Sequence, residues 1–143
     1  MHLTRFADNG LRCLMHLALH PGKTITARDI ARGMALSEDH LLKVVQRLAQ
    51  LGYVETLRGR GGGVRLVREP AEINIGEVVR NTEESFRIVE CFDEAANTCP
   101  IAPACTLAPA LDEALRAFLA VLDRYTLEDL TRQPRRLTRL LIA

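Results

Sequence analysis

The strongest constraint on this chain is a cluster of three of its four cysteines, Cys91, Cys99 and Cys105, in the pattern C-x7-C-x5-C. Two prolines and several small residues lie between them, which predicts a loop and not a helix. Three thiols on one loop can converge on a single point, but they cannot all pair as disulfides with one another. Thiolates select zinc, copper(I) and iron–sulfur centres, and a three-cysteine site leaves one coordination position to be filled from elsewhere. The spacing therefore favours a metal or cluster site, with incidental thiols, or one disulfide and a spare thiol, as the alternatives.

The rest of the composition narrows the class of protein. A chain of 143 residues is one domain, or one domain with an appendage. The net charge of +1 means that any binding of nucleic acid must depend on local clusters of charge. No apolar run approaches a membrane span, and the opening MHLTRFADNG lacks the apolar core of a signal peptide. We therefore expect a cytoplasmic protein with no membrane contact, where thiols stay reduced and a metal is favoured over a disulfide.

The first apolar stripe predicts a helix over residues 3–20, with Thr4 as its N-cap. Gly10 lies inside this helix, where glycine costs about 1 kcal/mol against alanine, and a close packing neighbour would explain it. Cys13 is expected to be a small buried hydrophobic residue. Asp8 is expected to be a solvated first-turn carboxylate, which the helix dipole favours.

Two further helices are predicted next. The first covers residues 24–34 with Thr26 as a candidate N-cap, and the second begins at Ser37 as its cap and stops at Gly52. The second helix carries a strong apolar stripe of Leu41, Val44, Val45, Leu48 and Leu51. Two short helices joined by a tight turn are typical of a helix-turn-helix.

A glycine-rich basic hairpin follows directly. Residues 53–57 and 64–67 are predicted to be its strands, and the sequence RGRGGG forms its tip. A helix-turn-helix followed by such a hairpin is a winged helix. Arginines suit contacts to phosphates and to a narrow minor groove, and glycines let the backbone approach DNA closely. A phosphate-cradling enzyme loop is disfavoured because no helix and no Walker lysine follow the glycines. A merely solvated hairpin is the other alternative.

The last third of the chain is predicted to be mostly helical. Residues 73–81 indicate an extended entry and a helix, whereas residues 83–90 have no clear pattern. A heptad seam in residues 106–125 consists of Leu111, Leu115, Phe118, Leu122 and Tyr125. Further apolar residues on its other flanks favour a helix that faces both its own domain and a second chain, with an intramolecular amphipathic helix as the alternative. Thr126 and Asp129 predict a capping box for a final helix.

These elements predict a mainly α fold with a small β-hairpin. We expect a winged helix-turn-helix DNA-binding domain at residues 1–82 and a cluster-binding cysteine loop at residues 83–105. A long dimerisation helix and a C-terminal segment occupy residues 106–143.

With its parts in this order, the chain resembles the bacterial winged-helix transcription regulators that carry iron–sulfur clusters, the family that includes IscR. The resemblance covers almost the whole chain, through LTRFADNGLRCLMHLA, LSEDHLLKVVQRLAQLGYVETLRGRGGGVRL, INIGEVVRNTE and TCPIAPACTLAPALDEALRAFLAVLDRYTLEDL. The segments ECF, CPIAPAC and LDRYTLEDL are most similar to the nitric-oxide-sensing NsrR branch.

The resemblance implies a homodimer with an iron–sulfur cluster in each loop, held by Cys91, Cys99 and Cys105. It also implies that Asp8 of the partner subunit completes a 4Fe–4S cluster, with 2Fe–2S as the alternative. An oxygen ligand is a poor match for soft iron and should leave easily. The chain departs from its relatives in a longer gap between the first two cysteines, and in Asn9 where an aromatic residue is common.

The function implied by the resemblance is a DNA-binding transcriptional repressor that senses nitric oxide and then releases an inverted-repeat operator. The recognition helix would enter the major groove and the wing would hold the flanking DNA. The candidate DNA contacts are Ser37, His40, Lys43, Arg58, Arg60, Gly61, Gly62 and Arg65.

Three alternatives remain at this point. The cluster could report iron–sulfur supply or redox state, or three cysteines and another ligand could hold a structural zinc ion. An enzyme would need a pocket with a poised acid or base, and the four histidines do not cluster with the cysteines in sequence, so we do not expect catalysis. His16 and His20 are expected to be surface or capping residues and not a zinc pair.

Overall fold

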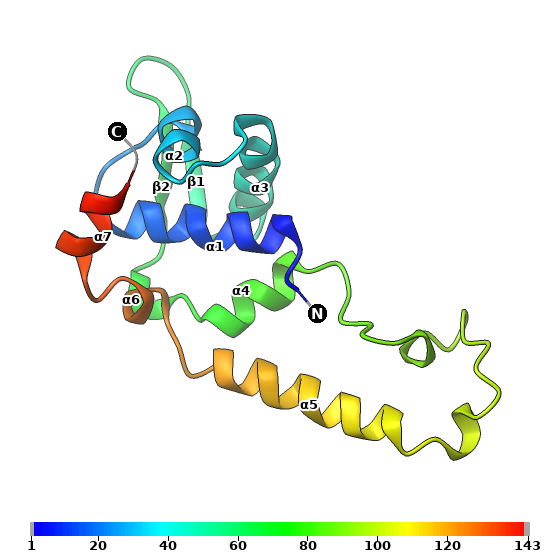
Figure 1. The fold of residues 1–143 in the computed structure, drawn as a ribbon. Helices are drawn as coiled ribbons and strands as arrows, with labels where there is room; N and C mark the ends of the chain where they lie inside the picture. The colour runs from blue at the N-terminus through cyan, green and yellow to red at the C-terminus, as the bar shows by residue number, and fades with distance from the viewer. Residues whose placement is uncertain (1, 142–143) are drawn as a thin grey trace.

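The computed structural model describes residues 2–141 and is mainly helical with one β-hairpin, as predicted (Figure 1). Short 3₁₀ turns lie at Pro70–Glu72, Glu90–Phe92 and Ala102–Ala104. None of the helices in these residues is long and apolar enough to cross a membrane. The helices and strands are α1 (Arg5–Ala18), α2 (Ala27–Gly33), α3 (Glu38–Gln50), β1 (Val54–Leu57), β2 (Gly63–Leu66), α4 (Ile75–Thr82), α5 (Leu107–Leu122), α6 (Leu127–Leu130) and α7 (Pro134–Leu140).

The helix starts follow the predicted caps with one exception. The Ala7 amide donates to Thr4 Oγ1 at 3.2 Å, and Thr126 forms the predicted capping box with Asp129. Ser37 occupies the N-cap position of α3, but its side chain makes no capping hydrogen bond, so this prediction was wrong for the hydroxyl. Two acidic residues in the first turn of α3 supply favourable charge at this helix end instead.

The turn between α2 and α3 gives the helix-turn-helix its angle. Ala35 adopts the left-handed conformation with φ 53°, and the Leu36 amide donates to the Ala31 carbonyl at 2.7 Å. At the other end of α3, Gly52 has φ 73°, which fits its predicted role as the helix stop. These two positive-φ residues set where α3 begins and ends relative to its neighbours.

The wing is a two-stranded antiparallel hairpin in which Val54 pairs with Leu66 and Leu57 with Gly63. A third segment, not predicted from the sequence, joins it through Ile25. The Ile25 amide donates to the Val64 carbonyl at 2.9 Å, and the Val64 amide donates to the Ile25 carbonyl at 2.8 Å. A side chain at Gly63 would come within 2.6 Å of the Ile25 oxygen, so glycine is required for this pairing. The wing is thereby fixed to the segment that precedes α2.

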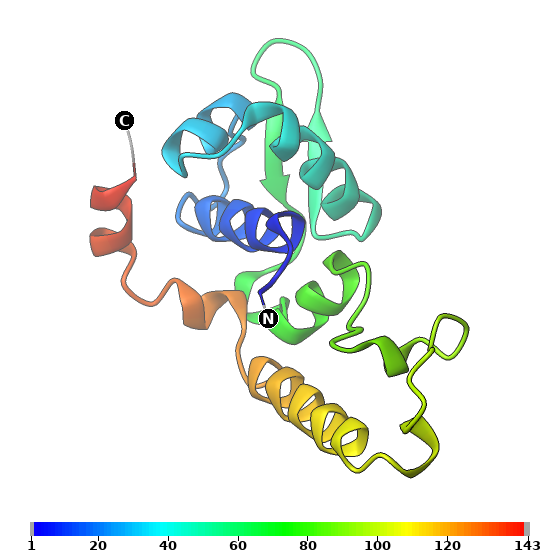
Figure 2. The ribbon, with the colours of Figure 1, turned by 45° about the vertical axis from the view of Figure 1, so that its right-hand side comes forward.

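The core surrounds α1, which packs against both α3 and α4 (Figures 1 and 2). Cys13 is fully buried there, and burial raises the pKa of its thiol to about 12, which confirms the prediction of a buried hydrophobic residue. Burying each large apolar side chain contributes about 1.5–3 kcal/mol. The largest fully buried side chains are Tyr53, Leu14, Ile30, Leu41, Leu48, Ile73 and Leu127.

The chain returns to this core after α5. The Leu127 amide donates to the Ile73 carbonyl at 2.9 Å, and the Ile75 amide donates to the Tyr125 carbonyl at 3.0 Å. Arg80 of α4 forms a bidentate ion pair with Asp123 at 2.6 and 2.7 Å. The C-terminal end of α5 is therefore held against α4, while the rest of α5 extends away from the winged helix (Figure 2).

Candidate DNA-binding face and cysteine loop

The start of α3 separates its apolar and polar residues onto two sides. Leu41, Val44 and Leu48 are buried against the core. Ser37, His40 and Lys43 are exposed on the outer side, as a recognition helix requires. These three side chains are therefore available to a partner.

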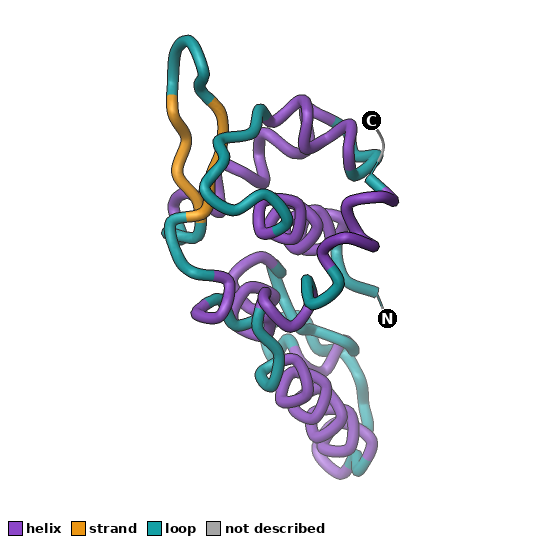
Figure 3. The backbone as a smooth tube through the Cα atoms, turned by 90° about the vertical axis from the view of Figure 1, so that its left-hand side faces the viewer, coloured by secondary structure: helices purple, strands orange, loops and turns teal. Residues whose placement is uncertain are grey.

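The tip of the wing projects away from the helices (Figure 3). Its residues Arg58, Arg60 and Gly61 are exposed. Gly62 is half-buried, its amide donates to the Gly59 carbonyl at 2.9 Å, and a side chain there would overlap the Leu57 carbonyl oxygen. Glycine is thus needed for the turn, and the tip presents backbone and two arginines to its surroundings.

Arg65 differs from the other candidate contacts because it has an acidic partner. It stands opposite Glu55 in the strand register, and its Nε lies 2.6 Å from Glu55 Oε1. Arg68 lies over the Tyr53 ring at 5.0 Å. Within residues 2–141, Arg58 and Arg60 form no ion pair. The free positive charge of the wing is therefore at its tip.

The cysteine loop follows α4 and contains no buried residue from 83 to 106. Its three cysteines are free thiols and half-buried. The Glu90 carboxylate accepts the Thr98 amide at 2.6 Å and the Thr98 hydroxyl at 2.8 Å, and these bonds lower the pKa of Glu90. Glu90 and Thr98 thus join the two ends of the segment between Cys91 and Cys99.

The structure puts the three thiols on one loop but does not gather them with a fourth ligand in a single chain. In the described part of the chain, no three His, Cys, Asp or Glu side chains are arranged to hold a metal ion. The donor set nevertheless suits a soft metal, because its thiols are free and reach the surface, whereas Cys13 is sealed in the core.

Asp8 lies in the first turn of α1 and is exposed. Its Oδ2 is 3.6 Å from Nη1 of Arg12, one turn along the helix, and Nη2 of Arg12 donates to the Met34 carbonyl in the turn between α2 and α3. Sequence reasoning missed Arg12, although its spacing of four residues from Asp8 was a visible signal. Arg12 therefore connects the candidate ligand to the helix-turn-helix.

A second link joins α1 to the base of the cysteine loop. The Glu83 carboxylate accepts the Thr4 amide at 2.7 Å and the Thr4 hydroxyl at 3.2 Å. Thr4 is the cap of α1, and Glu83 is the first residue after α4. The start of α1 and the start of the loop are thus held together.

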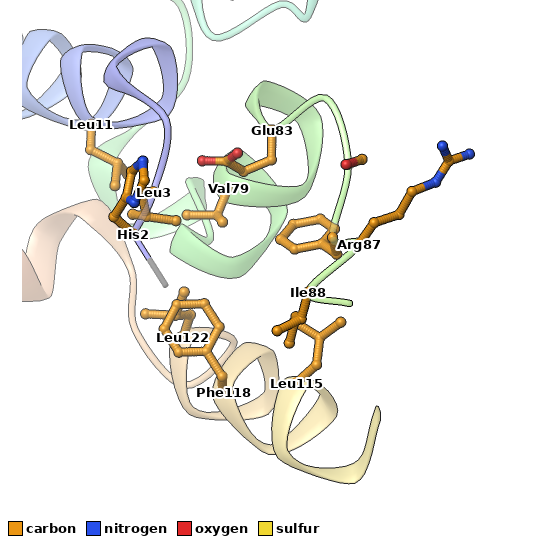
Figure 4. Close-up of a pocket in the computed structure, with 12 residues that line it drawn as sticks. His2, Leu3, Leu11, Val79, Glu83, Arg87, Ile88, Leu115, Phe118 and Leu122 are labelled. Carbon is orange, nitrogen blue, oxygen red and sulfur yellow. The ribbon is translucent and has the colours of Figure 1, made fainter. Parts of the chain in front are cut away.

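An apolar groove of about 560 Å³ lies beside this link, between α1, α4, residues 85–88 and α5 (Figure 4). Leu115, Phe118 and Leu122 of the predicted heptad seam point into it (Figure 4). Leu107 and Val121, on other flanks of α5, are 61% and 41% exposed. Three of the five seam residues thus face their own domain, whereas Tyr125 is 45% exposed, and apolar surface remains on the helix for another partner.

The histidine prediction was wrong for His16, which is only 5% exposed. Its ring packs against Gly33 and stacks on His20 at 4.8 Å between centroids. The absence of a side chain at Gly33 creates the space for the ring, and this could not be read from the spacing of the histidines. His20 does act locally, since its Nδ1 lies 2.8 Å from the His16 carbonyl oxygen.

A helix-turn-helix with a basic wing, followed by a thiol loop and a long apolar helix, defines a winged-helix transcription regulator. A family model described as "Rrf2: Iron-dependent Transcriptional regulator" matches residues 3–133. The chain belongs to the Rrf2 family.

Its relatives agree with this assignment. The chain is 54% identical over 142 residues to the HTH-type transcriptional regulator NsrR of Bacillus subtilis, covering 99% of this chain and 97% of that protein. It is 52% identical to the NsrR of Geobacillus kaustophilus, covering 91% and 89%. Among solved structures, T. potens IscR has a TM-score of 0.74 at 25% identity, covering 92% and 87%. CymR, the global cysteine regulator of B. subtilis, has a TM-score of 0.69 at 29% identity, covering 92% and 97%.

Proposed function

We propose that this chain is a transcriptional repressor that binds an inverted-repeat operator as a homodimer and releases it in response to nitric oxide. The observation that carries the proposal is the loop of three free thiols joined to a winged helix whose candidate DNA contacts are exposed. Similarity to regulators named NsrR supports it. Free thiols also agree with a cytoplasmic protein.

The proposed cluster ligands are Cys91, Cys99 and Cys105, with Asp8 of the partner subunit as the fourth. A 4Fe–4S cluster held there would supply iron that nitric oxide can attack. The residues of the chain provide three thiolates on a loop with little packing of its own, and one carboxylate at the exposed start of α1. The proposed boundaries remain residues 1–82, 83–105 and 106–143 for the DNA-binding domain, the loop and the dimerisation segment.

Arg12 connects the proposed cluster ligand Asp8 to the helix-turn-helix. Its guanidinium contacts both Asp8 and the Met34 carbonyl. Movement of the Asp8 carboxylate would therefore displace Arg12 and alter its hydrogen bond to the turn that orients α3. A second route is the bond between Glu83 and Thr4, because motion of the loop base pulls on the cap of α1. A small rotation of α3 is sufficient to release the operator, since both DNA-binding domains of a dimer must fit their half-sites at once.

Dimerisation is supported by α5. No residue of this helix is buried within one chain, although it is rich in leucine and alanine. Its exposed apolar residues, among them Leu107 and Val121, favour an interface with another protein. A second copy of the chain is the occupant that the two-fold operator requires.

The test is DNA binding by anaerobically purified protein at fixed salt, with stepwise addition of nitric oxide and the absorption spectrum recorded on the same samples. Salt is fixed because phosphate contacts make affinity steeply salt-dependent. We expect cluster absorbance and DNA affinity to fall together. If the cluster is destroyed while binding persists, the cluster does not control that site, and sensing of iron–sulfur supply becomes the better explanation.

Matched variants test the ligands. Cys91→Ser should lose the iron, whereas Cys13→Ser, which changes a thiol in the core, should keep it. Asp8→Ala should alter DNA affinity or the nitric oxide response, and an unchanged result in both would remove Asp8 from the ligand set. Metal analysis separates these outcomes from a structural zinc site, which is colourless.

A further inference from the structure

A second basic segment, besides the wing, lies at the C-terminal end of this chain. Residues 132–143 hold four of the 19 Lys and Arg residues and none of the 18 Asp and Glu residues. The rest of the chain therefore carries more acidic than basic residues. Such an asymmetry favours a polyanionic partner for the basic segment.

The basic segment is placed beside the DNA-binding head. Leu137 and Leu141 of α7 and its flank border a cavity of about 370 Å³, whose other wall includes Met15 of α1 and Met34 of the turn before α3. Thr138 borders a second cavity with Lys23. Leu137 and Leu141 thus lie toward the helix-turn-helix, whereas Leu140 is 72% exposed.

The arginines of α7 are available for a partner. Arg135, Arg136 and Arg139 are exposed, and none of them forms an ion pair with another described residue. Arg132, just before α7, differs because it pairs with Asp129. Two carboxylates border cavities with α7, and each already has an arginine partner: Asp29 of α2 pairs with Arg32, and Asp129 pairs with Arg132.

The position of α7 indicates which DNA it would meet. It lies beside α1, on the opposite side of the winged helix from the cysteine loop and from the start of α5 (Figures 1 and 2). Its Thr138 borders a cavity with Asp29 and Arg32 of α2. If α5 lies at the two-fold axis, α7 lies at the outer edge of each head. DNA outside the half-site is the part of the duplex nearest that edge.

We propose that α7 is an additional DNA-backbone contact, in which Arg135, Arg136 and Arg139 bind phosphates that flank the half-site. The proposal rests on the proposed DNA-binding function and adds a contact outside the recognition helix and the wing. Contacts to phosphates carry no sequence information, so α7 contributes affinity and position on the duplex, not recognition of bases.

The experiment compares the wild-type protein with the triple variant R135Q/R136Q/R139Q on a fluorescent duplex of arbitrary sequence, across a series of salt concentrations. The slope of log affinity against log salt should become shallower by about 0.9 for each phosphate that is no longer neutralised, and affinity should fall roughly tenfold or more. R132Q is the matched control and should leave the slope unchanged, because Arg132 pairs with Asp129. Leu137→Ser keeps every arginine but removes an apolar side chain that packs α7 against the helix-turn-helix. It should weaken DNA binding as well.

The outcomes are distinct from failure of the proposed function. If wild-type protein binds no DNA even at the lowest salt concentration, the proposed function fails and the α7 contact fails with it. If wild type binds and the triple variant has the same slope, α7 is not a contact although the proposed repressor function stands. Normal binding by Leu137→Ser would also overturn the proposal, since placement of the helix would not matter. A triple variant that keeps its DNA affinity but no longer binds vesicles of phosphatidylglycerol would assign the arginines to a membrane surface and overturn it too.

Discussion

Two glycines inside helices have opposite surroundings. A Cβ at Gly10 would lie 3.7 Å from Thr82 Cγ2, which is an ordinary van der Waals contact. The expectation that a close packing neighbour requires glycine at this position was therefore wrong. A Cβ at Gly33 would lie 2.7 Å from Cε1 of the buried His16 ring. We expect Gly10→Ala to stabilise the fold by about 0.5–1 kcal/mol and Gly33→Ala to destabilise it by about 1–3 kcal/mol, as measured by urea unfolding.

The control for the second substitution is a double-mutant cycle. Once His16→Ala has removed the ring, Gly33→Ala should cost little or become favourable, because alanine is the better helix former. An equal cost in both backgrounds would show that the ring is not the cause.

His16 also predicts a pH dependence of stability. Burial lowers its pKa below the ordinary value of 6.5, His20 lowers it further, and Asp29 partly raises it. The unfolded chain therefore takes up this proton first as the pH falls. The contribution of His16 to stability is present above its ordinary pKa and is lost on acidification below it.

The measurement is the urea midpoint of cluster-free, reduced protein from about pH 8 to about pH 5.5, an interval that spans the ordinary histidine pKa. His16→Leu should flatten the curve over this interval, and His40→Leu, a change at an exposed position, should not. Parallel curves for wild type and His16→Leu would exclude His16 as the titrating group.

At the scale of elements, the wing predicts that its unpaired and paired arginines contribute differently to DNA binding. Arg58 and Arg60 form no ion pair with another described residue, whereas Arg65 is held by Glu55 at 2.6 Å. We expect Arg58→Gln and Arg60→Gln each to weaken DNA binding and to reduce the salt slope by about 0.9. Arg65→Gln should have a smaller effect, because Arg65 must leave its carboxylate before it can meet a phosphate.

Glu55→Gln supplies the complementary test, since it frees Arg65 without removing it. DNA affinity should rise in this variant, and the rise should vanish when Arg65→Gln is added. A fall in affinity for Glu55→Gln would mean that the ion pair positions the wing for binding.

Periodicity and capping residues predicted the ends of several helices but not the contacts between distant segments. Thr4, Thr126 and Gly52 mark helix ends correctly, because a cap is a local bond between neighbours in sequence. The pairing of Ile25 with Val64 was not predicted, because it joins residues far apart in the chain and one residue gives no strand pattern. The helix α7 was also missed, since its short basic run has no cap signal beyond Pro134.

For the whole molecule, the exposed apolar flank of α5 predicts a dimer that a single charge disrupts. Val121 is 41% exposed in one chain. Val121→Glu should weaken self-association by at least about 2 kcal/mol, because a carboxylate would be buried without a partner. Sedimentation equilibrium measures this directly.

Val67→Glu is the matched control, since Val67 is 57% exposed on the wing side and away from α5. It should leave the dimer unchanged. Equal dissociation by both variants would indicate a general effect of charge, and dissociation by neither would place the interface elsewhere.

The sequence predicted the individual residues of the candidate site but not the contacts that connect them. The spacing of the cysteines and the exposure of the DNA face follow from patterns along the chain. The shared guanidinium of Arg12 does not, because its second partner, Met34, is a backbone carbonyl in another part of the fold. The proposed ligand from a second chain cannot be predicted from a pattern within one chain, and the proposal rests on the family resemblance alone.

The absence of any buried residue from 83 to 106 has a consequence for conformational entropy. Ordering a backbone costs about 1–2 kcal/mol per residue, and this segment gains little from apolar burial to offset that cost. Bonds from the thiols to a bound cluster would therefore supply most of the ordering free energy, so loading and local folding become one equilibrium. Amide hydrogen exchange in residues 91–105 should then report cluster occupancy, with slow exchange in loaded protein and fast exchange after its loss.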